Sequence, residues 1–121
     1  MTGVLVWVGV AVFGAAGAYA RFSVGTWVGA RGAFPTGTFV VNLTGAFVLG
    51  ILTGLAITGD ALLVFGTGLL GAYTTFSTWM VEAQRLAEEA EFTAMTSYLV
   101  LSMVAGLAAA GLGWAVGSVL S

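Results

Sequence analysis

The sequence contains no cysteine, no histidine and no lysine. Without cysteine, the chain can form neither a disulfide nor a thiolate metal site. Without histidine and lysine, it lacks the usual general base and the residue that forms Schiff bases. Its net charge is −2 and it has only three basic residues, so it offers no basic cluster for nucleic acid. These absences argue against an enzyme and against a nucleic-acid-binding protein.

Charge of either sign is scarce, whereas hydrophobic residues are abundant. Charged residues make up 7% of the chain and hydrophobic residues 60%, while a soluble domain carries roughly a quarter charged residues. Three basic and five acidic side chains are too few to cover the surface of a soluble protein of 121 residues. The surplus of apolar side chains must therefore face lipid, which indicates an integral membrane protein.

Four long apolar runs lie between the charged positions. A hydrocarbon core about 30 Å thick requires about 20 residues of helix. The runs predict transmembrane helices over Val4–Val28, Gly37–Thr58, Ala61–Val81 and Phe92–Val119. The predicted connections are short, with a tight turn at Gly59-Asp60. We therefore expect one all-α domain, residues 1–121, with four transmembrane helices.

The chain has 19 glycines, which would weaken helices in water. In a membrane, small residues allow helix backbones to approach closely. Gly50 and Gly54 form one GxxxG pair, and Gly113 and Gly117 form another. Both pairs predict tight contact between helices, either within one subunit or between two.

The arginines are distributed unevenly between the two ends of the predicted bundle. Arg21, Arg31 and Arg85 all lie toward the first and third connections, and the other side has no basic residue. The positive-inside rule places those two connections in the cytoplasm. Arg21 stands within the first apolar run, where it either faces a cavity or partner or extends to the headgroups as an interfacial anchor.

The third run carries polar residues at mid-membrane depth. Residues 71–79 read GAYTTFSTW, with four hydroxyl side chains beside a glycine and aromatic rings. Hydroxyl and β-branched residues weaken a helix locally, so we expect the third helix to be broken near its middle. Backbone carbonyls freed by a break are tolerated where they are buried in protein, line a cavity or hold a cation.

Further polar residues fall at helical spacing in the second and fourth runs. Thr38 and Asn42 are four apart and share a helix face. Asn42 is either a hydrogen-bonding link between helices or an amide donor to a ligand. A possible strip of hydroxyl groups comprises Ser77, Thr78, Tyr98 and Ser102. The alternative is that these hydroxyls bond only to carbonyls of their own helices.

Three segments follow one another with a distinctive spacing. They read GAYARF over 17–22, PTGTFVVNLTG over 35–45 and GAYTTFSTW over 71–79, followed by Glu82. In residues, order and spacing they resemble the Fluc (CrcB) family of fluoride channels over nearly the whole chain. The third segment is the most specific, because TTFST beside a membrane glycine is rare elsewhere.

The resemblance implies an antiparallel, dual-topology dimer in the plasma membrane that exports fluoride passively and protects against its toxicity. It implies a structural Na⁺ at the dimer interface, held by the backbone carbonyls of Gly71 and Thr74. Arg21 matches the family's first-helix arginine, with a structural or electrostatic role. The positions that match the family's anion pathway are Asn42, Phe76, Trp79, Thr38, Ser77, Thr78, Glu82, Tyr98 and Ser102.

One position departs from the family pattern. Trp79 stands where the family has the second of two pathway phenylalanines. Tryptophan is larger, and its edge carries an N–H. Two assemblies therefore stay open: a conducting homodimer, and a heterodimer with a homologous subunit in which this chain conducts poorly alone. A proton-coupled small multidrug exporter is disfavoured, because it needs a carboxylate in the first helix and none precedes Asp60.

Overall fold

Long apolar helices dominate residues 2–121, which are described by a computed structural model. Four spans in these residues are long and apolar enough to cross a membrane: Gly3–Val28, Thr36–Gly54, Gly59–Glu88 and Phe92–Leu120. The elements are α1 (Thr2–Val28), α2 (Thr36–Gly54), α3 (Gly59–Ala61), η1 (Leu62–Leu70), α4 (Gly71–Tyr73), α5 (Ser77–Glu88) and α6 (Phe92–Leu120). The predicted all-α fold with four spans is confirmed.

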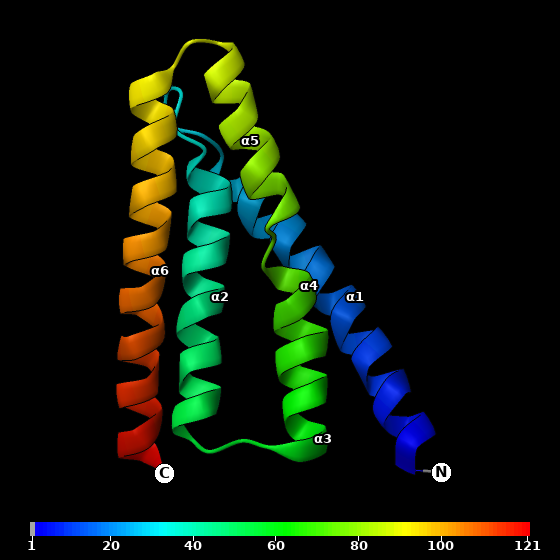
Figure 1. The fold of residues 1–121 in the computed structure, drawn as a ribbon. Helices are drawn as coiled ribbons and strands as arrows, with labels where there is room; N and C mark the ends of the chain where they lie inside the picture. The colour runs from blue at the N-terminus through cyan, green and yellow to red at the C-terminus, as the bar shows by residue number, and fades with distance from the viewer. Residues whose placement is uncertain (1) are drawn as a thin grey trace.

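The spans form two pairs that lean against each other (Figure 1). Helix α2 packs along the longer α6, and these two helices make the most extensive contact between elements of the described residues. Helix α1 packs on η1 and α4 of the third span. The first and third connections lie at one end of the molecule, and the second lies at the other end (Figure 1).

Facing glycines hold α2 and α6 together. A Cβ atom at Gly50 or Gly54 would collide with the backbone of α6 at Ala110 or Trp114, and one at Gly113 or Gly117 would collide with the backbone of α2. Because these positions have no side chain, the two backbones come into direct contact. The predicted GxxxG pairs thus face each other within one chain.

Helix α1 meets a stretch of unusual winding in the third span. Residues Leu62–Leu70 form a π-helix, a wider helix that is rare in proteins. Its backbone lies directly against α1: a Cβ at Gly17 would collide with the Leu69 carbonyl, and one at Gly68 would lie 3.0 Å from the Val10 carbonyl. Glycines on both sides of this contact allow the two backbones to approach across it.

The second connection differs from the sequence prediction. Helix α2 ends at Gly54 instead of Thr58, and Gly59-Asp60 begins α3 instead of forming the turn. Ala56 adopts a positive φ of 60°, and its N–H bonds to the Thr53 carbonyl. This left-handed residue ends α2 four residues earlier than predicted. The turn therefore occupies residues 55–58.

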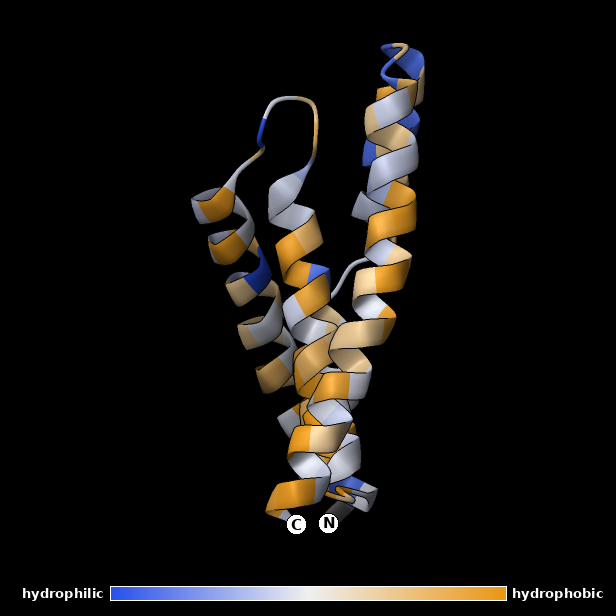
Figure 2. Ribbon diagram, turned by 90° about the vertical axis from the view of Figure 1, so that its left-hand side faces the viewer, coloured by the Kyte–Doolittle hydropathy of each residue, from blue (hydrophilic) through white to orange (hydrophobic). Residues whose placement is uncertain are grey.

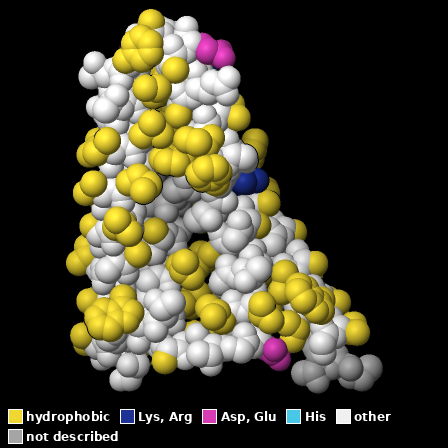
Figure 3. Space-filling view, in the orientation of Figure 1, with side chains coloured by type: hydrophobic (Ala, Val, Ile, Leu, Met, Phe, Trp, Pro, Cys, Tyr) yellow, Lys and Arg dark blue, Asp and Glu magenta, His cyan; other side chains and the backbone are white. Residues whose placement is uncertain are grey.

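Most large apolar side chains point outward, as expected of helices surrounded by lipid. Trp27 is 86% exposed and Val119 is 84% exposed. Hydrophobic residues follow the helices along their length (Figure 2), and they cover much of the face shown in Figure 3. The small buried core contains Ala83, Leu86 and Tyr98 between α5 and α6. It lies close to the break in the third span.

Candidate ion pathway

The third span is interrupted between α4 and α5. Thr74 is extended, with φ −79° and ψ 158°, and α5 starts again at Ser77. The Thr74 hydroxyl still donates to the Leu70 carbonyl at 2.9 Å, which closes the last turn before the break. The predicted break near the middle of the third span is confirmed at residues 74–76.

Asn42 of α2 pairs with the backbone at this break. Its Nδ2 donates to the Thr75 carbonyl at 2.9 Å, and its Oδ1 accepts from the Thr75 N–H at 2.8 Å. One amide side chain thus satisfies both polar groups of a residue that has left the helix. Of the two interpretations of Asn42, the link between helices is what this geometry supports, although a second Nδ2 hydrogen stays available as a donor.

The same interactions release two backbone carbonyls. In an unbroken helix the Thr75 N–H would bond to the Gly71 carbonyl, and the Thr78 N–H would bond to the Thr74 carbonyl. Here the Thr75 N–H bonds to Asn42, and the Thr78 N–H bonds to the Thr75 hydroxyl at 3.2 Å. The carbonyls of Gly71 and Thr74 thereby lose their helical donors. Carbonyl oxygens freed in this way are suitable ligands for a cation such as Na⁺.

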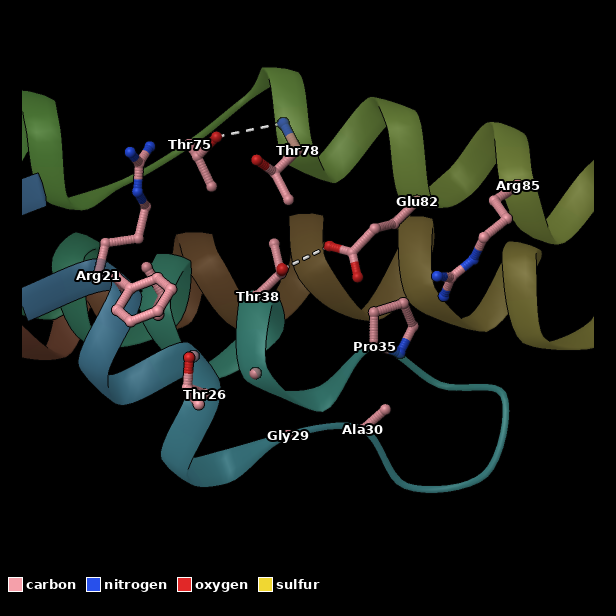
Figure 4. Close-up of a pocket in the computed structure, with 14 residues that line it drawn as sticks. Arg21, Thr26, Gly29, Ala30, Pro35, Thr38, Thr75, Thr78, Glu82 and Arg85 are labelled. Carbon is pink, nitrogen blue, oxygen red and sulfur yellow. Dashed lines mark hydrogen bonds between the residues drawn. The ribbon is translucent and has the colours of Figure 1, made fainter.

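A first hollow, of about 370 Å³, opens on the side of the break toward the first and third connections. We call it the arginine hollow. Its polar and charged side chains come from α1, α2 and the third span (Figure 4). They are Arg21, Thr26, Thr38, Thr75, Thr78, Glu82 and Arg85. Of the predicted residues, the structure thus brings Arg21, Thr38, Thr78 and Glu82 together.

A hydrogen bond crosses the arginine hollow between α2 and α5. The Thr38 hydroxyl donates to the Glu82 carboxylate, and Figure 4 draws this contact. The side chains of Arg21 and Arg85 line the same space, so the Glu82 carboxylate shares it with two positive charges. Because the hollow contains charges of both signs, the free-energy cost of placing each charged side chain within the membrane is lower.

A second hollow, also of about 370 Å³, lies between α2 and the third span. We call it the break hollow, and it opens on the face seen in Figure 3. Its lining includes Asn42, Gly71, Thr74, Phe76 and Trp79. The Phe76 side chain is 70% exposed, and its ring centroid lies 5.6 Å from that of Trp79. Aromatic edges and neutral polar groups therefore share one surface.

Thr75 lines both hollows, and sequence reasoning did not single it out as a site residue. It is the only buried polar residue identified in residues 3–121, with 8% of its surface exposed. The available signal was its place at the centre of the hydroxyl-rich segment. Arg85 was likewise treated only as a topological marker, yet it lines the arginine hollow beside Glu82.

The four residues of the predicted hydroxyl strip lie in different surroundings. Ser77 is exposed, and Thr78 lines the arginine hollow. Tyr98 is fully buried, with its ring 6.3 Å from that of Trp79. The Tyr98 and Ser102 hydroxyls have no hydrogen-bond partner among residues 2–121. The Tyr98 ring thus lies beside Trp79, its hydroxyl has Thr38 and Glu82 close by, and Ser77 lies apart.

Comparison with known proteins agrees with this architecture. Residues 8–114 match the family described as CrcB-like protein, Camphor Resistance (CrcB). A protein of Mycolicibacterium paratuberculosis named fluoride-specific ion channel FluC 2 is 53% identical over 93% of this chain and 94% of the relative. One of Symbiobacterium thermophilum, named fluoride-specific ion channel FluC 1, is 44% identical over 92% of this chain and 96% of its own length.

The match to known proteins and the four apolar helices lead to the same assignment. The family model covers most of the chain, and the relatives align over nearly their full lengths. The four spans have the length and composition of membrane-crossing helices. The chain is therefore a multi-pass plasma-membrane protein that belongs to the CrcB family, the Fluc family of fluoride channels.

Proposed function

We propose that this chain is a subunit of a fluoride channel, through which F⁻ leaves the cell passively, and that it has no enzymatic activity. The observation that carries the proposal is the pair of hollows that meet at the buried break, both of which have uncharged polar side chains in their linings. Asn42, Thr74 and Trp79 line one of them, and Thr38 and Thr78 line the other. The relatives named as fluoride-specific channels support the same substrate.

The chemistry of fluoride fits such a lining. Fluoride is small and strongly hydrated, so a pathway must replace the water that the ion loses. Hydroxyl and amide groups donate hydrogen bonds without a fixed charge that would trap the anion. The edge of the exposed Phe76 ring carries partial positive charge. In the arginine hollow, Arg21 and Arg85 together outweigh the negative charge of Glu82 and make the electrostatic potential more favourable for an anion.

The antiparallel dimer is part of this proposal, and the break hollow supports it. Gly71 and Thr74 line this hollow, which lies at the break near the middle of the third span and opens on one face of the chain. Lipid chains cannot satisfy backbone polar groups. A second subunit that covers this face would shield them and would enclose the exposed Phe76 ring in a protein-lined pathway.

A structural Na⁺ at the dimer interface also belongs to the proposal. Its ligands would be the Gly71 and Thr74 carbonyls, whose helical donors are engaged elsewhere. The ion would supply fixed positive charge near the anion path. We expect the assembled protein to melt at a higher temperature in Na⁺ than in K⁺ or N-methylglucamine. Identical melting curves in the three cations would contradict this part of the proposal.

The second candidate is a heterodimer in which this chain conducts poorly by itself. Trp79, packed against Tyr98 where the family pattern has phenylalanine, is the observation that favours it. Relatives carry both the names FluC 1 and FluC 2, which agrees with paired subunits. Fluoride efflux from liposomes that contain only this chain distinguishes the two. Efflux at channel rates supports the homodimer; efflux that requires an added homologous subunit supports the heterodimer; none in either case contradicts the fluoride channel.

A further inference from the structure

The first connection, residues 29–35, is an ordered hairpin that ends in an aromatic side chain. Arg31 and Phe34 exchange two backbone hydrogen bonds, each 3.1 Å long. Gly29 and Gly32 adopt positive φ values of 68° and 60°, which glycine accepts without strain. The backbone of this connection therefore determines the direction in which the Phe34 side chain extends.

The Phe34 ring packs against Tyr98 of α6. The two rings are nearly perpendicular, at 87°, and their centroids are 5.5 Å apart. This is the edge-to-face geometry that aromatic pairs prefer. Phe34 is half-buried, whereas Tyr98 is 0% exposed and belongs to the buried core between α5 and α6. Phe34 thus covers one side of the Tyr98 ring.

Packing, and not a hydrogen bond within the described residues, holds the Tyr98 hydroxyl in place. This hydroxyl lies close to Thr38 and Glu82, yet it has no hydrogen-bond partner in the described part of the chain. The other aromatic neighbour of the Tyr98 ring is Trp79, at 6.3 Å. We propose that Phe34 is a positioning residue of the ion pathway, which keeps the Tyr98 hydroxyl beside the hydrogen bond that crosses the arginine hollow. This inference rests on the proposed fluoride-channel function.

Phe34 lines neither hollow, although the residue that follows it does. Pro35 lies in the wall of the arginine hollow (Figure 4), whereas the Phe34 side chain packs against the buried core. An ion in either hollow would therefore not touch the Phe34 ring. Any effect of this ring on transport must pass through Tyr98, so Phe34 acts as a positioning residue and not as a ligand.

The size of the effect follows from the energy of the aromatic pair. An edge-to-face contact contributes stability that corresponds to a factor of about two to ten in an equilibrium constant. Leucine at position 34 would keep apolar bulk but would remove the ring, so the Tyr98 ring would gain other orientations. The Tyr98 hydroxyl would then be in place for a smaller share of the time. We expect Phe34→Leu to lower fluoride efflux by the same factor of about two to ten.

The main experiment tests whether Phe34 acts on the Tyr98 hydroxyl. Efflux from liposomes is measured for Phe34→Leu in the wild-type chain and in Tyr98→Phe, which keeps the ring and deletes the hydroxyl. We expect a loss in the first background and no further loss in the second, because no hydroxyl is left to misplace. Equal losses in both backgrounds would overturn the proposal, since they would show that Phe34 only fills space.

Phe13→Leu is the matched control. Phe13 forms the same kind of aromatic pair with Phe65, at 5.0 Å and 73°, between α1 and η1. The same substitution there removes an edge-to-face contact that does not involve Tyr98, and it should leave efflux near the wild-type rate. A loss in Phe13→Leu as large as that in Phe34→Leu would contradict the proposal.

A second measurement observes the Tyr98 ring directly and does not depend on transport. The chain has three tyrosines, so carbon-13 at their ε positions gives few NMR signals, and those of Tyr98 are identified by their absence in Tyr98→Phe. A ring that is held in place gives two separate ε signals, whereas a ring that turns rapidly gives one averaged signal. We expect two signals in the wild-type protein and one in Phe34→Leu.

The outcomes separate this proposal from the channel function. A single averaged signal in the wild-type protein would overturn the positioning role without any variant. Unchanged signals in Phe34→Leu, in a protein that carries fluoride, would also overturn it and would leave the channel function standing. If the wild-type protein carries no fluoride with any homologous partner, the channel function fails and the positioning role fails with it.

Discussion

In two regions of the molecule, the backbone polar groups find their hydrogen-bond partners in different ways. In α2 and α6, glycines bring two continuous helices into direct contact, and backbone polar groups stay within their own helices. In the third span, the helix is interrupted at residues 74–76, and backbone groups bond to side chains instead. The first region provides a rigid support, and the second exposes polar groups where a membrane protein can use them.

The comparison shows how the support positions the polar region. Asn42 belongs to α2, the helix fixed by the glycine contacts, and it pairs with Thr75 at the break. The Thr44 hydroxyl, two residues further along α2, bonds to the Tyr73 hydroxyl at 2.8 Å. The broken span is thus attached to the rigid pair by side chains on both sides of Thr74. Changes in the support should affect stability, and changes at the break should affect transport.

The largest effect is expected from Gly113→Leu, which disrupts the contact between α2 and α6. A side chain here meets the backbone of α2 at Phe47 and Ile51, which has no room to move. We expect a destabilisation of more than about 4 kcal/mol, so that the folded protein is not recovered. Size-exclusion profiles in detergent measure this outcome.

Gly111→Leu is the matched control for that variant. It lies on the same helix, where an added Cβ meets no atom of residues 2–121 within 4 Å. We expect a change within about 0.5 kcal/mol. Equal recovery of the two variants would show that the α2–α6 contact does not depend on the absence of side chains.

The next effect is expected from Asn42→Leu, which removes the link between the two regions. The Thr75 N–H and carbonyl would both lose their partner in a buried place. We expect a loss of about 2–4 kcal/mol in stability, together with a lower fluoride flux. Thermal unfolding followed by circular dichroism measures the first effect, and liposome efflux measures the second.

Thr53→Val serves as the control on the same helix, because the Thr53 hydroxyl bonds only to carbonyls of α2. It should leave both measurements near wild type. A wild-type melting temperature for Asn42→Leu would mean that the break is held by other contacts.

Phe76→Ile tests the exposed part of the break hollow without disturbing its backbone. Isoleucine keeps apolar bulk and removes the aromatic edge, so we expect fluoride flux to fall by at least about tenfold, or about 1.4 kcal/mol at the barrier. Assembly should be unchanged, because isoleucine keeps an apolar side chain at this position, which is 70% exposed within one chain. Phe92→Ile, at the exposed start of α6, is the control. Normal flux in Phe76→Ile would remove this ring from the anion pathway.

The smallest effect is expected from Thr38→Val in the arginine hollow. This variant deletes the hydroxyl that donates to Glu82, for a cost of about 1 kcal/mol, and we expect a few-fold reduction in efflux. Thr26→Val changes an exposed hydroxyl that lines the same hollow and should have no effect. If both variants behave alike, the hydrogen bond to Glu82 has no special role.

Local chemistry explains the parts of the fold that were predictable. Apolar length determines the four spans, and consecutive hydroxyl residues weaken the third helix near Thr74. The second connection was predicted wrongly, because an alanine with positive φ at residue 56 leaves no mark in the sequence. The π-helix at Leu62–Leu70 was not predicted either, because the apolar composition of this segment does not distinguish it from an α-helix.

In the candidate site, too, contacts between residues distant in the sequence could not be predicted. Residue types and resemblance identified Asn42 as important, but they left open whether it binds a ligand or another helix. The pairing with Thr75 joins residues 33 apart in sequence, and no local pattern encodes such a distance. The role of Thr75 on both hollows was missed for the same reason. The partner of each GxxxG pair also depends on tertiary packing.

The pairing of one amide with both polar groups of Thr75 has a consequence for kinetics. The break is already assembled, so an arriving ion has no backbone to rearrange before it sheds its water. The activation enthalpy of transport should then reflect dehydration alone and should stay constant over a wide range of temperatures. In a variant without the amide, each passage would also require ordering of the chain, and the Arrhenius plot would become steeper and curved.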